Sequence, residues 1–432
     1  MNWNVRHARS DLAMKILIYS ANFAPEPTGI GKYSGEMAEW LASHGHEVRV
    51  VAAPPYYPSW QVAKGHRWPP YRKEQWRGCT VWRAPLWVPH NPGGLKRVLH
   101  LASFAFLSMP TMLLQWGWKP DVVMTVAPSF MCSPMGWLTA RVTGASAWIH
   151  IQDFEVDVAF TMGFLKGGLP RKLITSLERH MLRRFDAAST ISARMLDKLR
   201  EKGVSPEKCH HFPNWVDIDQ IRPLSTVSSY RARLGIPDTA TVALFSGSLG
   251  RKQGLQVIPA AAQLLANRAD IHFVICGDGV MKQEIEALCK GLERVHLMPL
   301  QDAAMLPDLL GLADVHLLPQ SPEAEDLVLP SKLTGMLSSG RAIIATCNPH
   351  SEIASVVSQC GLVVPPENAA ALASALTQLA DAPDLRRTMG QAARRYAEEQ
   401  IGRDAVLSHV VSDMQALRDG EHPLLSENVT DT

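Results

Sequence analysis

The sequence predicts an α/β protein with two doubly wound, parallel-sheet domains of the Rossmann-like kind. Short apolar runs of strand length alternate with helical patterns through most of the 432 residues. These runs are apolar almost throughout, as expected for strands that are buried on both faces of a parallel sheet. The alternation pauses at residues 213–229 and then starts again. The length of the chain and this pause together favour two domains.

The first half supplies four strands. KILIYSA, EVRVVAA, DVVMTVA and SAWIHIQ begin at Lys15, Glu47, Asp121 and Ser146. Helical patterns separate them at 32–43, 95–115 and 134–143. The strand–helix alternation is that of a parallel sheet with helices on its faces.

The second half repeats the pattern with TVALFSGS, IHFVICG, VHLMP, ADVHLLP, AIIAT and GLVVP. Helices are predicted at 254–266, 280–291, 303–310 and 331–339, and the chain is helical again after Glu367. We therefore expect a disordered leader (1–13), an N-terminal domain (14–222), a C-terminal domain (223–400), and a final helix and tail (401–432).

Composition narrows the function. The net charge of +2 argues against a dedicated nucleic-acid binder. This near-neutral total hides a charge difference between the two halves. Residues 1–225 hold 27 Lys and Arg against 17 Asp and Glu, and the remaining residues hold 16 Lys and Arg against 24 Asp and Glu. All 12 Trp also lie in the first part. A basic, Trp-rich half suits anionic or amphipathic partners, although Trp also simply packs cores.

Cysteine usage and the start of the chain bear on location. The seven Cys show no CxxC and no metal-ligand spacing, which is typical of reduced thiols in a cytoplasmic protein. The first apolar run, MKILIYSA, is too short for a signal peptide. Residues 95–118 are largely apolar but contain His100, Pro110 and Gln115, so we expect either a core helix or a helix that dips into a membrane surface, with Lys96 and Arg97 at one end.

Ligands of open α/β sheets bind beyond the carboxyl ends of the strands, here in the cleft between two domains that face each other. In the first such loop, Gly29, Ile30 and Gly31 precede a helix and could bring backbone N–H groups to an anion. A dinucleotide site is disfavoured, because the glycines lie about nine residues past the strand and the next strand ends without an acid. A plain tight turn stays open.

His150 and Asp153 lie at the end of the fourth strand of the first half. A carboxylate there could orient an acceptor hydroxyl, and His150 could bond a sugar or phosphate. Because His150 alternates with buried residues, it is equally a candidate for a satisfied core histidine.

Three loops of the second half could bind one ligand. Gly247 frees the backbone after the first strand, and Arg251 and Lys252 add positive charge suited to a diphosphate. Gly277, Asp278 and Gly279 follow the second strand, and Pro299 and Leu300 follow the third, where backbone groups could meet a flat base. That the three loops follow successive strands of one sheet is stronger evidence for a shared ligand site than any single loop.

A further segment, EAEDLVLPSKLTGMLSSGRAII, joins a strand to a helix at 323–344. Ser331 is a candidate N-cap whose neighbouring N–H groups point at phosphates, and Lys332 adds a cation. A solvated lysine beside an ordinary cap is the alternative.

These motifs in order resemble those of the retaining glycosyltransferases of family 4, which have the GT-B fold. The likeness rests on PEPTGIGKYSGEMAEWL, FPNWVD, SGSLGRKQGL, ICGDG, ADVHLLP and PSKLTGMLSSGRAII, and covers roughly residues 14–400. It implies that the C-terminal domain binds a nucleotide-sugar and the N-terminal domain an acceptor. It also implies transfer without an essential metal or other cofactor, and a C-terminal helix that crosses back. Consistently, DID at 217–219 lies between the domains and is not interpreted as a metal site.

The chain departs from the family pattern at four charged positions. Ser248 and Gln253 stand where the family has Arg and Lys, and Leu327 and Gly335 stand where it has a pair of Glu. These four roles are therefore not transferred. We expect Glu325 and Asp326 to contact the sugar hydroxyls. The catalytic candidates are His150, Asp153 and Glu325. Leu327 and Val328 are expected beside the donor.

The function expected from this resemblance is transfer of a sugar from a UDP- or GDP-sugar to a lipid-diphosphate-linked or growing saccharide of a colanic-acid-like exopolysaccharide. The acceptor would be a polyprenyl-diphosphate-sugar, and the basic first half would meet the inner face of the plasma membrane. Two alternatives stay open: a GT-B sugar-nucleotide epimerase, and a non-catalytic nucleotide-sugar-binding scaffold, which the missing Glu pair would suit.

Overall fold

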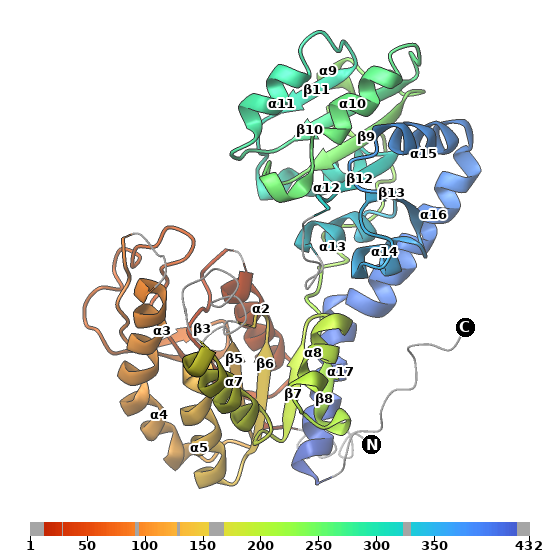
Figure 1. Ribbon diagram of the computed structural model, residues 1–432. Coiled ribbons are helices and arrows are strands. Elements are labelled where there is room, and N and C mark those ends of the chain that lie inside the picture. Colours follow the sequence, from red (N-terminus) through yellow and green to blue (C-terminus); the bar gives the residue numbers. More distant parts are fainter. Residues whose placement is uncertain are drawn as a thin grey trace, which may run out of the picture. The chain divides into compact units, whose positions relative to one another are not determined.

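The computed structural model describes residues 13–27, 29–90, 95–127, 130–154, 168–322 and 330–420. The chain forms two compact units, one holding the described residues up to Pro213 and from Leu407 onward, and the other Asn214–Val406. We call them the N-terminal and C-terminal domains. Each is an α/β unit with a parallel sheet, which confirms the predicted fold class (Figure 1).

The N-terminal sheet has the strand order β3-β4-β2-β1-β5-β6-β7-β8. Its neighbours run parallel, except for the antiparallel edge pair β3 and β4. The central strand β5 is buried along its whole length, as its unbroken apolar sequence requires. The strands are β1 (Lys15–Ser20), β2 (Glu47–Ala52), β3 (Arg72–Trp76), β4 (Cys79–Arg83), β5 (Val122–Ala127), β6 (Ser146–Ile151), β7 (Ala187–Thr190) and β8 (Cys209–His211).

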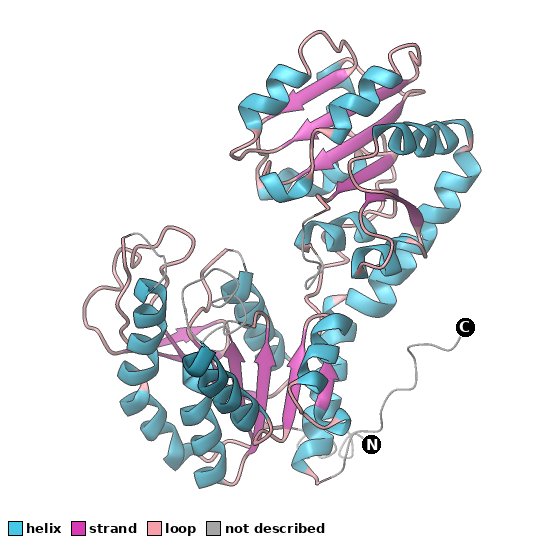
Figure 2. Ribbon diagram, in the orientation of Figure 1, coloured by secondary structure: helices cyan, strands magenta, loops and turns pink. Residues whose placement is uncertain are grey.

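Helices pack on this sheet (Figure 2). The expected single helix over 95–115 is two helices, α3 and α4, that meet at Ser108. Pro110 explains the break, because proline has no N–H to continue the ladder of the preceding helix. The helices are α2 (Gly29–Ser43), α3 (Leu95–Leu107), α4 (Met109–Gln115), α5 (Ser133–Thr143), α7 (Gly168–Leu182), α8 (Ala193–Glu201) and α17 (Arg403–Arg418).

The C-terminal sheet has the order β11-β10-β9-β12-β13-β14, and all its pairs are parallel. Alternate residues of β9 enter the cores on its two faces, Phe245 on one and Leu244 on the other. The strands are β9 (Thr241–Ser246), β10 (Ile271–Cys276), β11 (Val295–Met298), β12 (Val315–Pro319), β13 (Ala342–Thr346) and β14 (Gly361–Val364).

Helices connect these strands and end the domain. Asn368 caps α15 by accepting a hydrogen bond from the N–H of Ala371 at 2.9 Å. The helices are α9 (Ser229–Leu234), α10 (Val257–Leu264), α11 (Lys282–Leu288), α12 (Leu306–Gly311), α13 (Ser331–Ser338), α14 (Glu352–Val357), α15 (Ala369–Asp381), α16 (Pro383–Tyr396) and the π-helical turn Ala397–Ile401.

The final helix, α17, leaves the C-terminal domain and joins the N-terminal one from Leu407 onward. There Asp413 lies 2.9 Å from Nδ1 of His210 on β8. At the point of departure, the N–H of Val216 donates to Ile401 (2.9 Å) and that of Arg403 donates to Val216 (3.1 Å). The chain thus crosses back, as expected for the GT-B fold.

Candidate functional site

The predicted ligand loops of the C-terminal domain meet at the carboxyl edge of its sheet, where parallel strands end together. The loops after β9 and β10 are joined by backbone hydrogen bonds. The N–H of Gly247 donates to Cys276 (2.9 Å), that of Leu249 donates to Asp278 (2.8 Å), and that of Met281 donates to Leu249 (2.9 Å). The two loops therefore form one rigid floor.

Gly277 and Gly279 are required by this floor itself. Gly279 has φ +153°, and a Cβ there would lie 2.6 Å from the carbonyl oxygen of Leu249. A Cβ on Gly277 would overlap the carbonyl oxygen of Gly247. What approaches these glycines is thus the neighbouring loop. Their contact with a ligand stays a prediction.

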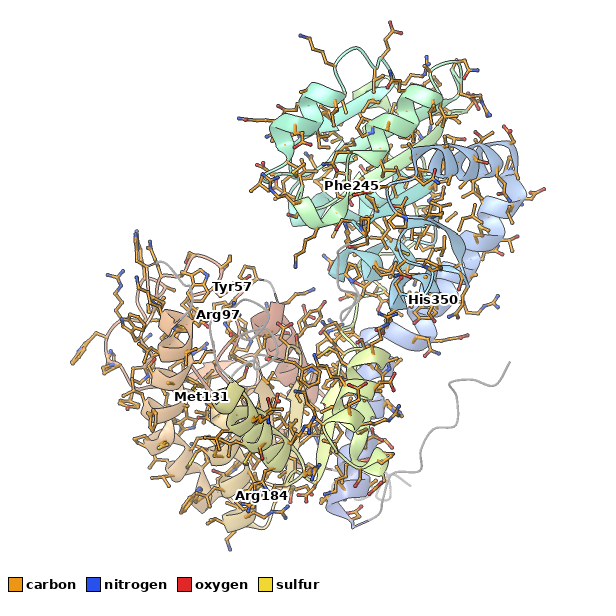
Figure 3. The ribbon with its side chains drawn as sticks, in the orientation of Figure 1. Tyr57, Arg97, Met131, Arg184, Phe245 and His350 are labelled. Carbon is orange, nitrogen blue, oxygen red and sulfur yellow. The ribbon has the colours of Figure 1, made fainter. Side chains whose placement is uncertain are left out.

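Lys332 lies on the first turn of α13, beside this floor. Its Nζ is 4.6 Å from the centroid of the Phe245 ring, and its Cδ lies 3.6 Å from where a Cβ on Gly247 would stand. The Nζ is buried and finds no hydrogen-bond partner among the described residues. Desolvation lowers the pKa of Lys332 to about 8. Figure 3 labels Phe245 within this domain.

Sequence reasoning found Lys332 but missed Phe245. The only signal for Phe245 was its place two residues before Gly247, at the end of an apolar strand. The face of an aromatic ring attracts a cation, so Phe245 offsets part of the cost of burying the ammonium. The charge as a whole stays uncompensated in the described part of the chain, so an anion beside it would stabilise it.

Arg251 and Lys252 add two exposed cations on a short 3₁₀ turn. Neither side chain has a hydrogen bond or ion pair with another described residue. The N–H of Ser321, in the loop after β12, donates to the carbonyl of Lys252 at 2.9 Å. This bond ties a third loop to the same floor.

Asp278, Pro299 and Leu300 lie at the same edge. The Asp278 carboxylate accepts from the N–H of Gly279 at 2.8 Å, and Leu300 is 70% exposed. The carbonyl of Pro299 accepts from Nε2 of Gln301 at 2.7 Å. Leu300 can therefore cover a flat group, whereas one acceptor of Pro299 is already engaged.

Part of the predicted site lies outside the described residues. This holds for Glu325, Asp326, Leu327 and Val328, and for the side chain of Ser331. The predicted N-cap was wrong by one position, because Pro330 is the N-cap of α13 and Ser331 is its first residue. Gly335, which stands where the family has the second Glu, is buried, and a Cβ there would lie 3.2 Å from Cδ1 of Leu310. An acidic side chain at that position would have to displace Leu310.

In the N-terminal domain, His150 is buried and bonded at both ring nitrogens. Nδ1 lies 3.0 Å from the hydroxyl of Ser189, and Nε2 lies 3.3 Å from Nε2 of Gln152. The ring packs against Phe212 at 4.5 Å, and burial lowers the pKa of His150 to about 3. This geometry favours the satisfied core histidine over a proton-transferring one.

Asp153, three residues later, has an exposed side chain. Desolvation by the surrounding chain raises the pKa of Asp153, and the positive charge of Arg97 opposes the shift. An accessible carboxylate whose pKa is raised suits contact with a hydroxyl. Asp153 is therefore the better of the two predicted candidates in this domain.

Gly29, Ile30 and Gly31 open α2, as predicted, and Gly29 has φ +60°. A Cβ on Gly31 would overlap the carboxylate of Glu26. This buried carboxylate accepts from the N–H groups of Tyr56 (3.1 Å) and Tyr57 (3.0 Å). An acid of the chain itself thus occupies the place next to Gly31, which favours the tight-turn interpretation.

No group of three or more His, Cys, Asp or Glu among the described residues is arranged to hold a metal ion.

One stretch of the described residues, Lys96–Trp118, is long and apolar enough to cross a membrane. The core helices of soluble proteins also meet this criterion. Of the most apolar part of this stretch, 39% is buried. Much of its apolar surface faces outward. The exposed residues fall at helical spacing on α3 and α4: Leu99, Phe106, Leu107, Met109, Leu113 and Leu114.

The sequence matches two families of known proteins. Residues 28–215 match the family described as "Glycosyl transferase 4-like domain", and residues 240–382 match "Glycosyl transferases group 1". A relative from Escherichia coli (strain K12), WcaI, is 40% identical over 412 residues, which cover 93% of this chain and all of WcaI. WcaI is assigned to colanic acid biosynthesis as a glycosyl transferase.

Solved structures show the same fold. The sucrose-phosphate synthase of Thermosynechococcus elongatus superposes with a TM-score of 0.69 at 16% identity, over 94% of this chain and all of that one. HepE from Anabaena, in complex with UDP and glucose, superposes with a TM-score of 0.63 at 15% identity, over 93% and 100% of the two chains.

Proposed function

This chain belongs to the family-4-type glycosyltransferases of the GT-B fold, and on that premise we propose that it transfers a sugar from a UDP- or GDP-sugar to a lipid-diphosphate-linked saccharide. We further propose that the transfer retains the anomeric configuration and builds a colanic-acid-like exopolysaccharide. The similarity to WcaI supports the pathway, and the UDP in the HepE structure makes UDP the first nucleotide to test.

The single observation that carries the donor proposal is the buried ammonium of Lys332, which has no hydrogen-bond partner among the described residues. A nucleoside diphosphate gains negative charge as its bond to the sugar breaks, and preorganised cations stabilise that charge. Lys332 would meet the diphosphate directly, and Arg251 and Lys252 would approach it from the 3₁₀ turn. These three cations would replace the charged pair that the family has at the positions of Ser248 and Gln253.

The predicted acids complete the proposal. Glu325 and Asp326 would hold the sugar hydroxyls, and Asp153 would orient the acceptor hydroxyl for attack on the anomeric carbon. The geometry of His150 supports a structural role, so we assign it no step. The chemistry proposed here uses no metal ion or other cofactor.

The lipid part of the acceptor would lie at a membrane surface. The outward apolar residues of α3 and α4 recur at helical spacing, and we call them the apolar stripe; the exposed Lys96 and Arg97 lie at one end of it. Apolar residues on one helix face with basic residues beside them are typical of contact with anionic lipid. The domain would therefore act as a peripheral protein on the inner face of the plasma membrane.

The test is transfer of isotope-labelled sugar from UDP- and GDP-sugars to a polyprenyl-diphosphate-sugar, with the anomeric configuration of the product read by NMR. We expect a product with the configuration of the donor sugar. A product of inverted configuration would overturn the retaining assignment. An absence of transfer from every common UDP- and GDP-sugar, despite tight nucleotide binding, would favour the scaffold that the missing Glu pair at Leu327 and Gly335 allows.

A further inference from the structure

The N-terminal domain contains a cavity of about 510 Å³ that none of the predicted site residues lines. It lies between the loop after β2, residues 53–71, and the loop after β4, residues 84–90. Its walls include Trp60, His66 and Arg67 from the first loop, and Leu86, Val88 and His90 from the second. This volume is within the range of about 300–1,000 Å³ typical of small-molecule sites.

The cavity occupies the functional edge of the sheet. β2 and β4 are parallel neighbours, so both loops start at carboxyl ends of strands. Open α/β sheets bind their ligands at that edge. Tyr57 and Arg97, labelled in Figure 3, lie at the same edge of the domain.

Arg83, the last residue of β4, holds the loops in place. It is 2% exposed and donates hydrogen bonds to the carbonyls of Ala53 (2.8 Å) and Ala24 (2.6 Å). Its Nε donates to Glu74 on β3 at 2.8 Å. A buried cation that bonds two loops and the edge strand β3 at once gives the cavity a fixed frame.

Trp60 has the most unusual backbone in this region. Its φ is +52°, a left-handed conformation that is a clear outlier for a bulky residue and costs on the order of 1–3 kcal/mol. The half-buried indole packs against Tyr56 at 5.7 Å and against His100 at 5.3 Å, measured between ring centroids. Strain of this kind is concentrated at functional sites, where it presents a side chain to a ligand.

The polar groups of the cavity favour an anion. Nδ1 of His66 is buried and has no hydrogen-bond partner among the described residues, while its Nε2 lies 3.8 Å from Glu74. Arg67 is exposed and makes no ion pair with the described residues. Among the described residues, the lining contains Arg67, His66 and His90 but no Asp or Glu. An aromatic platform with an unpaired arginine beside it suits a ring that carries negative charge.

We propose that this cavity binds a saccharide that carries a carboxylate or a phosphate. The indole of Trp60 packs against the C–H face of the sugar ring, and Arg67 holds the anionic group beside the imidazoles of His66 and His90. Resting on the proposed function, the saccharide is the head of the acceptor. The Tyr71 hydroxyl donates to the carbonyl of Leu107 at 2.8 Å, which ties the cavity loop to the end of α3. The sugar head is thus held next to the apolar stripe that would meet the lipid.

Binding is tested by calorimetry on the full chain without any nucleotide. The probes are a hyaluronan tetrasaccharide for the carboxylate, glucose 1-phosphate for the phosphate, and cellotetraose and inorganic phosphate as partial ligands. We expect one of the two anionic sugars to bind roughly tenfold or more tightly than cellotetraose and inorganic phosphate. Equal binding of neutral and anionic sugars would overturn the anionic assignment, and binding of inorganic phosphate alone would overturn the saccharide.

Matched variants locate the binding. Trp60→Ala and Arg67→Gln should each weaken it roughly tenfold or more, whereas Trp68→Ala and Arg77→Gln should not change it. Trp68 is 80% exposed and lies outside the lining, and Arg77 pairs with Glu39 at 2.7 Å on the β3–β4 turn. Trp60→Phe should restore part of the affinity. Because Arg67 is exposed, its replacement leaves the fold intact, so unchanged binding in Arg67→Gln contradicts the proposal.

UDP binding measured on the same samples separates this inference from the proposed function. The cavity variants should bind UDP as the unchanged chain does. Sugar transfer with an unaltered KM for the acceptor in Trp60→Ala and Arg67→Gln would overturn the cavity proposal while supporting the transferase. The opposite result is also informative. If the unchanged chain binds the anionic saccharide but transfers no sugar, and both Trp60→Ala and Arg67→Gln lose that binding, the cavity proposal is supported and the proposed transferase function is overturned.

Discussion

The ammonium of Lys332 lies over the ring of Phe245, 4.6 Å from its centroid, in a place that offers it no hydrogen-bond acceptor among the described residues. A buried charge without a partner lowers stability. It is retained most readily when a ligand supplies the missing charge. In the proposed function, the diphosphate of the donor would supply that charge.

Lys332→Ala should weaken the binding of UDP or GDP by about 1–3 kcal/mol, the range for the loss of a charged hydrogen bond. Titration calorimetry with each nucleotide measures this change. Lys282→Ala is the control, because Lys282 is a partly exposed lysine on α11 that only approaches Asp278 at 3.9 Å. Equal affinity in Lys332→Ala and in the unchanged chain would remove Lys332 from the site.

Nucleotide affinity should fall as the pH rises above about 8. The pKa of Lys332 is lowered to about 8 by burial, so the ammonium that binds the anion is lost above that pH. Affinity should fall by about half between pH 7 and pH 8, and then by up to about tenfold per pH unit. Calorimetry in buffers of different ionisation enthalpy should show proton uptake on binding near pH 8. A Lys332→Ala protein with the same pH profile would contradict this assignment.

Lys332→Met should stabilise the free protein near neutral pH. The folded pKa of about 8 lies below the ordinary value of 10.5, so the unfolded chain binds more protons between these values and stability rises with pH across that window. Removing the charge should therefore raise the free energy of unfolding at pH 7 by up to roughly 3 kcal/mol, and by little at pH 10.5. Urea unfolding at the two pH values tests this. A gain that does not depend on pH would point to packing instead of charge.

Arg83→Gln should destabilise the N-terminal domain by about 3–5 kcal/mol, because it leaves Glu74 and the carbonyls of Ala24 and Ala53 without their buried partner. Thermal or urea unfolding measures the loss. The exposed pair of Arg77 and Glu39 is the comparison, since Arg77→Gln should cost less than about 1 kcal/mol. Similar losses in the two variants would show that Arg83 does not anchor the loops.

The double variant Phe106→Glu and Leu114→Glu should reduce binding to phosphatidylglycerol vesicles. These two side chains are the most exposed of the apolar stripe, at 67% and 63%. Charge on that face would lose burial in the lipid and gain repulsion from anionic headgroups. Vesicle flotation measures the change, with Val280→Glu on the other domain as the control. Equal flotation of the double variant and the unchanged chain would show that the membrane contact lies elsewhere.

Apolar runs predicted β1, β2, β5 and β6 and the strands of the C-terminal sheet, but they missed β3, β4, β7 and β8, although β7 is buried along its whole length. β1 and β9 coincide with KILIYS and TVALFS, whose side chains are almost all buried. β3, RKEQW, is half-exposed and has no apolar alternation that would mark it as a strand. Its place depends on pairing with β4 and on the bond between Arg83 and Glu74. The cavity beside it was therefore beyond the reach of periodicity.

The candidate site shows the same limit at the level of single residues. The sequence placed Lys332 at a helix start and His150 on a buried strand, and both placements agree with the structure. It could not show that Phe245 lies under the ammonium or that Ser189 bonds the imidazole, because these contacts join residues far apart in the chain. For His150 the unseen partner, Ser189, favours the structural role over the catalytic one.

The meeting of Val216 and Gly402 in an isolated parallel bridge has a consequence for evolution and engineering. The chain enters the C-terminal domain at Val216 and exits it at Gly402, and these two residues are adjacent. The C-terminal domain is therefore an insertion whose two ends lie side by side. A segment of that kind can be exchanged as a cassette without stretching the chain that carries it. If the proposed function holds, grafting residues 214–406 between relatives would move the choice of nucleotide-sugar and leave the choice of acceptor in place.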